Sequence, residues 1–166
     1  MRREKQALSR EECSSILHRN SSGVLSLADE KGWPYAVPLN YVFDGKNLYF
    51  HCAAQGEKTG ILERNSRAVF TVIDQDETVP EKLTSKYLSV IVKGQAEVIP
   101  NDEEAREALM NLGRKYSGIL GEQAIADHID QAWEKVRVIR LIPEEATGKM
   151  GSQLRKERIL QDERMA

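Results

Sequence analysis

Residues 48–58, Leu-Tyr-Phe-His-Cys-Ala-Ala-Gln-Gly-Glu-Lys, combine side chains that could bind an anion. An apolar, aromatic stretch typical of a β-strand runs up to His51, small residues follow, and Gly56 and Lys58 come where a helix would begin. Glycine lets the backbone approach a ligand closely, a helix N-terminus offers free N–H groups, and Lys58 adds a positive charge. The pattern fits a pocket for a small phosphorylated cofactor. It also fits a strand-to-helix connection with a solvated lysine and a packed histidine, and the spacing alone leaves both interpretations open.

The composition predicts one soluble globular domain. A chain of 166 residues, 40% hydrophobic and 30% charged, can bury a core without disulfides. Its net charge of −2 does not attract nucleic acid or an anionic membrane, and no apolar run approaches the roughly 20 residues of a membrane-spanning helix. The basic start lacks an apolar stretch behind it, so it is not a secretory signal. We therefore expect a cytoplasmic protein that binds neither nucleic acid nor membrane.

The cysteines and histidines do not indicate a metal site. Cys13 and Cys52 are too few for a disulfide framework or a closed zinc site. His18, His51 and His128 are scattered without the spacing of metal ligands. The sequence also lacks a phosphate-binding P-loop, a glycine-rich dinucleotide turn, a zinc-protease helix and a hydrolase nucleophile elbow. None of these classes of protein is expected.

Short strands joined by turns dominate the predicted elements. We expect strands at residues 23–29, 33–43, 47–52, 67–74, 87–99 and 136–142, a polar loop at 75–85, and helices behind Ser9, at 56–65, after Pro100 and around 124–133. The connections are those of hairpins, without the alternation of strands and helices that a parallel sheet needs. This order predicts an antiparallel barrel with appended helices.

Four local signals fix details of that barrel. Ser9 and Glu12 have the spacing of a capping box, and Asp44-Gly45 is a strong hairpin turn. The prolines at positions 34 and 38 lack a donor for a strand ladder, so their strand should lie at an edge or contain a bulge. Gly94 predicts a bend or bulge in the long strand 87–99.

Five motifs occur in an order that is characteristic of one family. They are Trp-Pro-Tyr-Ala-Val-Pro-Leu-Asn-Tyr at 33–41, Leu-Tyr-Phe-His-Cys-Ala at 48–53, Gly-Glu-Lys at 56–58, Tyr-Leu-Ser-Val-Ile-Val-Lys-Gly at 87–94 and Ala-Thr-Gly-Lys at 146–149. Over residues 1–150 the chain resembles the flavin-binding split-barrel proteins related to pyridoxamine 5'-phosphate oxidase, and within them the nitroimidazole-resistance (Nim) type. The resemblance implies a mainly β, α+β fold, a six-stranded antiparallel split β-barrel with peripheral helices. It also implies a homodimer with FMN in clefts at the interface. Residues 151–166 are expected to form a charged, helical tail.

The resemblance also implies roles for single residues. The strand Pro38-Leu39-Asn40-Tyr41 should lie along the flavin ring, with backbone groups of Val37 and Leu39 near its polar edge. His51 and Lys58 should face the ribityl phosphate or the space beside the flavin, which Ala53 keeps narrow and Gly56 opens to the backbone. Ser89 and Val90 should flank the cofactor, and Lys149 should complete the site from the same or the other subunit. Cys52 stands where the family often has serine, which leaves a hydroxyl contact there in doubt.

Each of these positions also has a purely structural interpretation. Pro38 can simply mark an edge strand, Asn40 can cap a turn, and Ser89 can satisfy a neighbouring backbone group. Strand aromatics such as Tyr41 usually bury surface rather than stack on a ligand. Lys149 would be solvated unless a partner covers it. We also expect His128 at the surface and the Glu103-Glu104 pair on a solvated face.

Two functions remain open from the sequence. The first is an FMN-dependent oxidoreductase of the nitroimidazole-resistance type, in which the flavin carries the redox chemistry and His51 donates a proton to, or anchors, a small electron-poor ligand such as a nitro compound or quinone. The second is a non-catalytic flavin- or haem-type cofactor binder that acts as a carrier or sensor. Vitamin B6 oxidation is not favoured, because the arginine pattern of that oxidase is not recognisable.

Overall fold

The computed structural model describes residues 6–165, with side chains up to residue 161. Residues 1–5 of the predicted domain and residue 166 of the predicted tail therefore lie outside the described residues. The helices are α1 (Arg10–Arg19), α2 (Glu57–Leu62), α3 (Glu103–Ser117), α4 (Glu122–Ala132) and α5 (Ser152–Met165), and the strands are β1 (Ser22–Ala28), β2 (Pro34–Asn40), β3 (Val42–Phe43), β4 (Leu48–Ala53), β5 (Arg67–Val79), β6 (Thr84–Ile99) and β7 (Val136–Met150).

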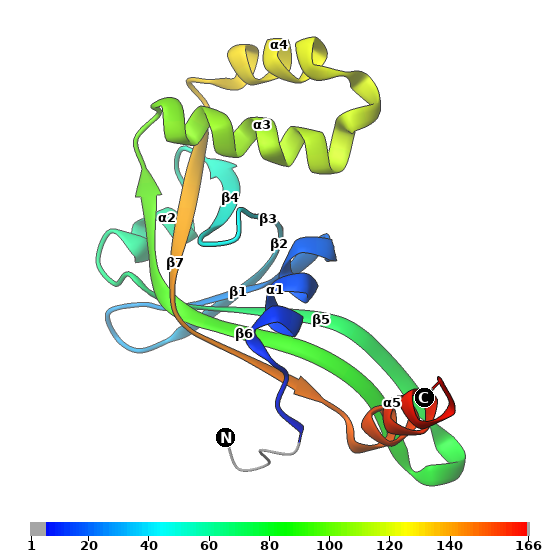
Figure 1. Ribbon diagram of the computed structural model, residues 1–166. Coiled ribbons are helices and arrows are strands. Elements are labelled where there is room, and N and C mark those ends of the chain that lie inside the picture. The colour runs from blue at the N-terminus through cyan, green and yellow to red at the C-terminus, as the bar shows by residue number, and fades with distance from the viewer. Residues whose placement is uncertain (1–5, 166) are drawn as a thin grey trace.

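The strands form one antiparallel sheet, as predicted. Its seven strands lie in the order β2-β1-β5-β6-β7-β4-β3. Figure 1 shows α3 and α4 stacked over one end of this sheet, while β5, β6 and β7 run away from them towards α5. The split-barrel architecture is thus confirmed, with seven strands where six were expected.

The additional strand arises at Tyr41, which divides the predicted strand 33–43. β2 lies at one edge of the sheet and β3 at the other, so the chain crosses between the two edges at this residue. The Tyr41 backbone N–H donates to the Tyr116 hydroxyl over 3.0 Å, and its carbonyl accepts from the same hydroxyl (2.7 Å) and from Lys115 Nζ (3.0 Å). Side chains of α3 therefore replace the strand ladder at the crossing.

The local signals in the sequence are confirmed. Ser9 and Glu12 exchange the two hydrogen bonds of a capping box, and the Asp44-Gly45 turn joins β3 to β4, with Gly45 at a φ of 96°. The strand that contains Pro34 and Pro38 is an edge strand. At Gly94 the register between β6 and β7 shifts.

The predicted polar loop at residues 75–85 is wrong. β5 and β6 instead continue as a ladder to the pair Val79 and Thr84, so only a tight tip separates them. The polar sequence of residues 75–85 resembles a loop because both strands are polar there and the apolar core does not extend to this end of the ladder. Lys86 holds the end together by ion pairs with Glu77 of β5 (3.5 Å) and Glu157 of α5 (3.1 Å).

Two apolar clusters lie on opposite faces of the sheet. The first fills the inside of the curled sheet and includes Tyr41, Phe50 and Phe70, each fully buried, together with side chains of α1 and α2. The Tyr41 hydroxyl donates to the Leu17 carbonyl over 2.7 Å, so this aromatic is a core residue. The second cluster lies between the outer face of β4 and β7 and the helices α3 and α4.

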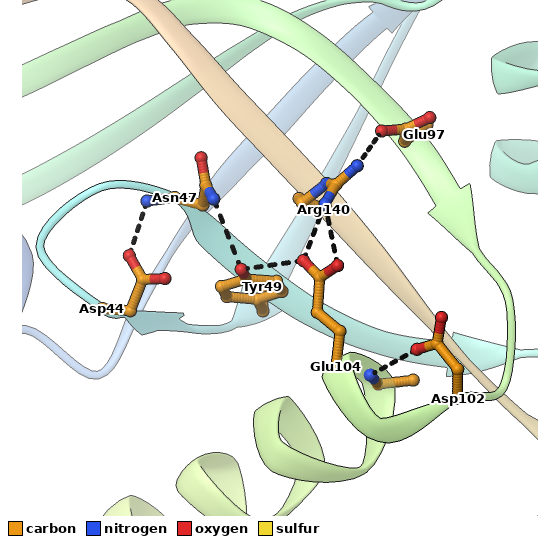
Figure 2. A network of polar contacts seen from close by, with 8 residues as sticks. Asp44, Asn47, Tyr49, Glu97, Asp102, Glu104 and Arg140 are labelled. Atoms are coloured by element: carbon orange, nitrogen blue, oxygen red, sulfur yellow. Dashed lines mark hydrogen bonds and ion pairs between the residues drawn. The ribbon is translucent and has the colours of Figure 1, made fainter.

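A polar network attaches the start of α3 to the sheet (Figure 2). Arg140 Nη1 donates to both carboxylate oxygens of Glu104 over 2.8 Å, and Arg140 Nη2 donates to Glu97 over 2.5 Å. The Tyr49 hydroxyl donates to Glu104 over 3.0 Å. The expectation that Glu104 lies on a solvated face is therefore wrong, because this carboxylate is half-buried and accepts bonds from two strands.

Candidate functional site

A cavity of about 570 Å³ lies between the sheet and the helices α3 and α4. Its lining from the sheet is Asn40, His51 and Val136, and its lining from the helical side is Leu109, Leu112, Gly113, Tyr116, Ser117, Leu120, Ala124, Ile125, His128, Ile129 and Ala132. The volume falls in the range of small-molecule sites, about 300–1,000 Å³. The cavity is therefore a candidate ligand site.

The alternation of strand β4 aims His51 at this cavity. Leu48, Phe50 and Cys52 point into the barrel core, whereas Tyr49 joins the cluster under α3 and α4. Since successive side chains of a strand point to opposite faces, His51 and Ala53 share the face of Tyr49. His51 is exposed and lines the cavity, so it is not a packed core histidine.

Asn40 reaches the same cavity from the last position of β2. It lies beside Tyr116, whose hydroxyl is held by the Tyr41 backbone. Burial raises the pKa of Tyr116, although hydrogen bonds with Tyr41 and Asn40 work against that rise. Tyr116 therefore stays a neutral hydroxyl that holds the junction of β2 and β3 against the cavity wall.

Two cations lie around Cys52, at the end of β4. Burial raises the pKa of the Cys52 thiol, whereas the positive charges of Lys58 and Arg137 lower it. Arg137 is the direct neighbour of Cys52 in the ladder between β4 and β7. Within the side chains described up to residue 161, no carboxylate forms an ion pair with either cation. This pair of half-buried cations is chemically suited to an anion.

Arg137 was not among the site residues predicted from the sequence. It follows a charged stretch at the start of the predicted strand 136–142, and nothing local marks it. The register of β7 against β4 would have shown it, because the pairing sets Arg137 opposite Cys52. Its Nη1 donates to the carbonyl oxygens of Val136 (2.7 Å) and Glu134 (3.3 Å), which fixes the guanidinium near the strand end.

Gly56 lies before α2, which is shorter than the predicted 56–65 helix. A side chain at Gly56 would meet nothing within 4 Å, so the space beside the backbone is open. Lys58 is half-buried in the first turn of α2. The helix also closes one end of the core through Ile61 and Leu62.

The remaining predicted site residues divide by burial. Tyr41 and Val90 are fully buried in the barrel core, so only their backbone could meet a ligand. Val37 and Leu39 pack against the core from β2, while Pro38, between them, is exposed on the outer face. These positions shape the sheet rather than offer side chains to the cavity.

Ser89 and Lys149 lie far from His51 within one chain. They are cross-strand neighbours of β6 and β7, and His51 pairs with Val138 near the start of β7. From Val138 to Lys149 the strand covers about 36 Å of path at roughly 3.3 Å per residue. The structure therefore brings together Asn40 and His51 at the cavity. Lys58 lies near Cys52, whose side chain points to the other face of β4, and Ser89 and Lys149 are not part of either group.

The described residues form neither a membrane-spanning helix nor a cluster of metal ligands. No helix between residues 6 and 165 is long and apolar enough to cross a membrane. Across the described residues, no group of three or more His, Cys, Asp or Glu side chains could hold a metal ion.

Comparison with protein families gives one match, to the family described as pyridoxamine 5'-phosphate oxidase, over residues 9–150. No curated protein matches the sequence significantly.

Many solved structures share the fold. A conserved hypothetical protein, Rv2991, from Mycobacterium tuberculosis matches with a TM-score of 0.78 at 20% identity, over 92% of this chain and 91% of that one. A protein described as a 5-nitroimidazole antibiotic resistance protein from Bacteroides thetaiotaomicron matches with a TM-score of 0.71 at 24% identity, over 87% and 86%. An FAD-binding protein from Mesorhizobium loti matches with a TM-score of 0.61 at 26% identity, over 89% and 98%.

Proposed function

The chain belongs to the pyridoxamine 5'-phosphate oxidase family, and on this premise we propose that it binds FMN between two copies of itself and reduces a small electron-poor molecule. Lys58 and Arg137 would hold the phosphate, and His51 would serve the reacting molecule. The similarity to an FAD-binding protein supports a flavin as the cofactor. The similarity to a nitroimidazole resistance protein supports an electron-poor acceptor.

The observation that carries the proposal is the pair of cations at the end of β4. Both Lys58 and Arg137 act on the buried Cys52 thiol, and no described carboxylate neutralises either of them. Phosphate forms strong charge-assisted hydrogen bonds with such groups. The open space beside Gly56 leaves the backbone accessible to the same anion.

The uncovered part of the outer sheet face supports a homodimer. α3 and α4 cover only the β4 end, and exposed apolar side chains follow over the rest, with exposed fractions of 37% at Val24, 62% at Ile73 and 39% at Ile91. Exposed apolar area of this kind marks interaction surfaces. A second copy on this face would also bring its own Ser89 and Lys149 near a site that one chain leaves incomplete.

His51 is the residue on which catalysis would depend. When bound, the flavin supplies the electrons. The protein has to deliver a proton, and histidine is the side chain that exchanges protons most readily near neutral pH. His51 is accessible from the cavity, on the face of β4 opposite to the Cys52 side chain.

Cofactor binding is tested by removing each cation separately. Lys58→Ala and Arg137→Ala should each weaken FMN by about 1.5–3 kcal/mol, the range for a hydrogen bond to a charged group. The matched control is Lys46→Ala, which removes an exposed lysine from the turn between β3 and β4. Isothermal titration with FMN measures all three. If the two variants bind FMN as tightly as the control, the cations do not hold the phosphate.

The catalytic role is tested separately with His51→Gln. The FMN content and melting temperature should be nearly unchanged, whereas reduction of a nitroaromatic acceptor by the reduced flavoprotein should fall by about 10²–10⁴-fold, the usual contribution of one general acid. Unchanged turnover per bound flavin would remove His51 from the chemistry. A flavin-loaded protein that reduces no acceptor would favour the alternative function, a cofactor carrier or sensor.

A further inference from the structure

We propose that the cavity under α3 and α4 binds an uncharged, flat, largely apolar molecule whose hydrogen-bond acceptor points to Asn40 and His51, as in a quinone or a nitroarene. The inference that this ligand accepts electrons from a flavin rests on the proposed function. The binding itself does not, because all the residues that line the cavity belong to one chain.

The lining decides against a charged ligand. Among the described residues that line the cavity there is no Lys, Arg, Asp or Glu. An ion buried there would lose its hydration without gaining an opposite charge, which is strongly unfavourable. The walls are instead apolar, with Leu109 and Leu112 from α3 and Ile125 and Ile129 from α4. Such walls favour hydrocarbon rings.

Polar groups line the cavity on both sides, with Asn40 and His51 on the sheet side and Tyr116, Ser117 and His128 on the helical side. Asn40 and His51 come from β2 and β4, and both carry N–H groups that can donate to an acceptor oxygen. The His51 ring makes no side-chain hydrogen bond to any other residue in the described range. Tyr116 cannot replace it, because its hydroxyl already serves the backbone of Tyr41. A ligand with an oxygen acceptor at one end therefore fits better than a pure hydrocarbon.

α3 and α4 approach each other closely at one wall of the cavity. A Cβ atom at Gly113 of α3 would lie 2.3 Å from Cγ2 of Ile125 of α4, so the two helices touch directly there. This close approach lies at the wall of the cavity, which both residues line.

The turn between the two helices carries an exposed apolar wall residue. Leu120, which is 64% exposed, lines the cavity, whereas its neighbour Ile119, which is 97% exposed, does not. A bound ligand would cover part of the exposed Leu120 side chain. Substitutions of Leu120 and of its neighbour Ile119 therefore form a matched pair of variants.

Two fluorescent probes test the proposal on the full chain. N-phenyl-1-naphthylamine is uncharged, and 8-anilinonaphthalene-1-sulfonate has the same ring system with a sulfonate added. We expect the uncharged probe to bind at least ten-fold more tightly, and menadione, a naphthoquinone, to displace it both with and without added FMN. Equal affinities of the two probes, or no displacement by menadione, would overturn the proposed ligand class.

Substitutions at Leu120 and Ile119 show where the probe binds. Leu120→Ser should weaken the uncharged probe at least five-fold, and Ile119→Ser should leave it unchanged. Equal losses would place the probe on the helix tip rather than in the cavity, and would overturn the proposal. FMN titrations of both variants should match the parent. A protein that binds probe and menadione but no FMN would contradict the proposed function and leave this inference standing.

Discussion

Tyr49→Phe tests whether the network under α3 holds this helix on the sheet. The Tyr49 side chain is only 7% exposed, and its hydroxyl both donates to Glu104 (3.0 Å) and accepts from Asn47 Nδ2 (3.3 Å). The substitution removes one oxygen and leaves the ring that packs against α3. It therefore isolates the polar contacts from the apolar ones.

The expected loss of unfolding free energy follows from the partners left behind. A hydrogen bond to a charged group contributes about 1.5–3 kcal/mol. Glu104 keeps two bonds from Arg140, and its side chain is 38% exposed, so water can replace part of the lost bond. Asn47, however, is buried with its Oδ1 already lacking a partner, and it would lose its bond to Tyr49 as well. The lost Asn47 bond is long, at 3.3 Å, so its loss adds less than water recovers at Glu104, and a loss of about 1.5–2 kcal/mol is expected.

The same variant should change the response to alkali. Burial, together with the hydrogen bond to Glu104, raises the pKa of Tyr49 from 10.0 to about 12 despite an opposing bond from Asn47. Between these pH values the unfolded chain loses this proton and the folded chain keeps it. Stability of the parent should therefore fall as pH rises from 10 to 12, and that component should be absent from Tyr49→Phe.

Urea unfolding measures both effects at pH 8 and pH 10.5. Tryptophan fluorescence can follow it, because Trp133 packs against the α3–α4 cluster whereas Trp33 is already 75% exposed in the folded chain. A loss below about 0.5 kcal/mol, no more than a neutral surface change, would refute the anchoring role of this network. An alkaline decline identical to that of the parent would refute the assigned pKa.

Three further predictions concern the sheet. Gly94→Ala should destabilise the protein by about 1–3 kcal/mol, because a Cβ atom there would lie 2.0 Å from the Ile142 carbonyl oxygen. Gly60→Ala is the control and should not destabilise it, because a Cβ atom there would meet nothing within 4 Å. Thermal unfolding of the two variants tests this prediction. Burial alone would raise the pKa of Asp74, but hydrogen bonds from Arg19 and Asn20 hold it below 3.8, so stability lost by the parent as pH falls below about 4 should be reduced in Asp74→Asn; equal acid unfolding curves would contradict this. Ile91→Lys, on the uncovered sheet face, should convert a dimer to a monomer in sedimentation, and Ile159→Lys on α5, equally exposed, should not.

Local chemistry made part of the fold predictable. The capping box at Ser9 and Glu12, the Asp44-Gly45 turn and the bulge at Gly94 each depend on neighbours in sequence or on one strand, and each was predicted correctly. The prolines of β2 correctly indicated an edge strand. Such features follow from backbone geometry that a few residues determine.

The rest depended on pairings between distant segments. Nothing near Tyr41 shows that the strand crosses to the opposite edge there, because the hydrogen bonds that permit it come from α3. Glu104 was predicted to be solvated because its partners, Arg140 and Tyr49, are distant from it in the sequence. Arg137 gains its position from the register of β7 against β4. His51 was predicted beside an open space and does line the cavity, but the helices on the other side of this cavity could not be placed from periodicity alone.

The central claim is that the cations at the end of β4 bind the phosphate of a flavin. Titration of the parent protein with FMN and with riboflavin tests it most directly, because the two ligands differ only in that phosphate. We predict that FMN binds at least ten-fold more tightly, about 1.4 kcal/mol, and that the difference disappears when both Lys58 and Arg137 are replaced by alanine. Equal affinity for the two flavins in the parent protein would contradict the account.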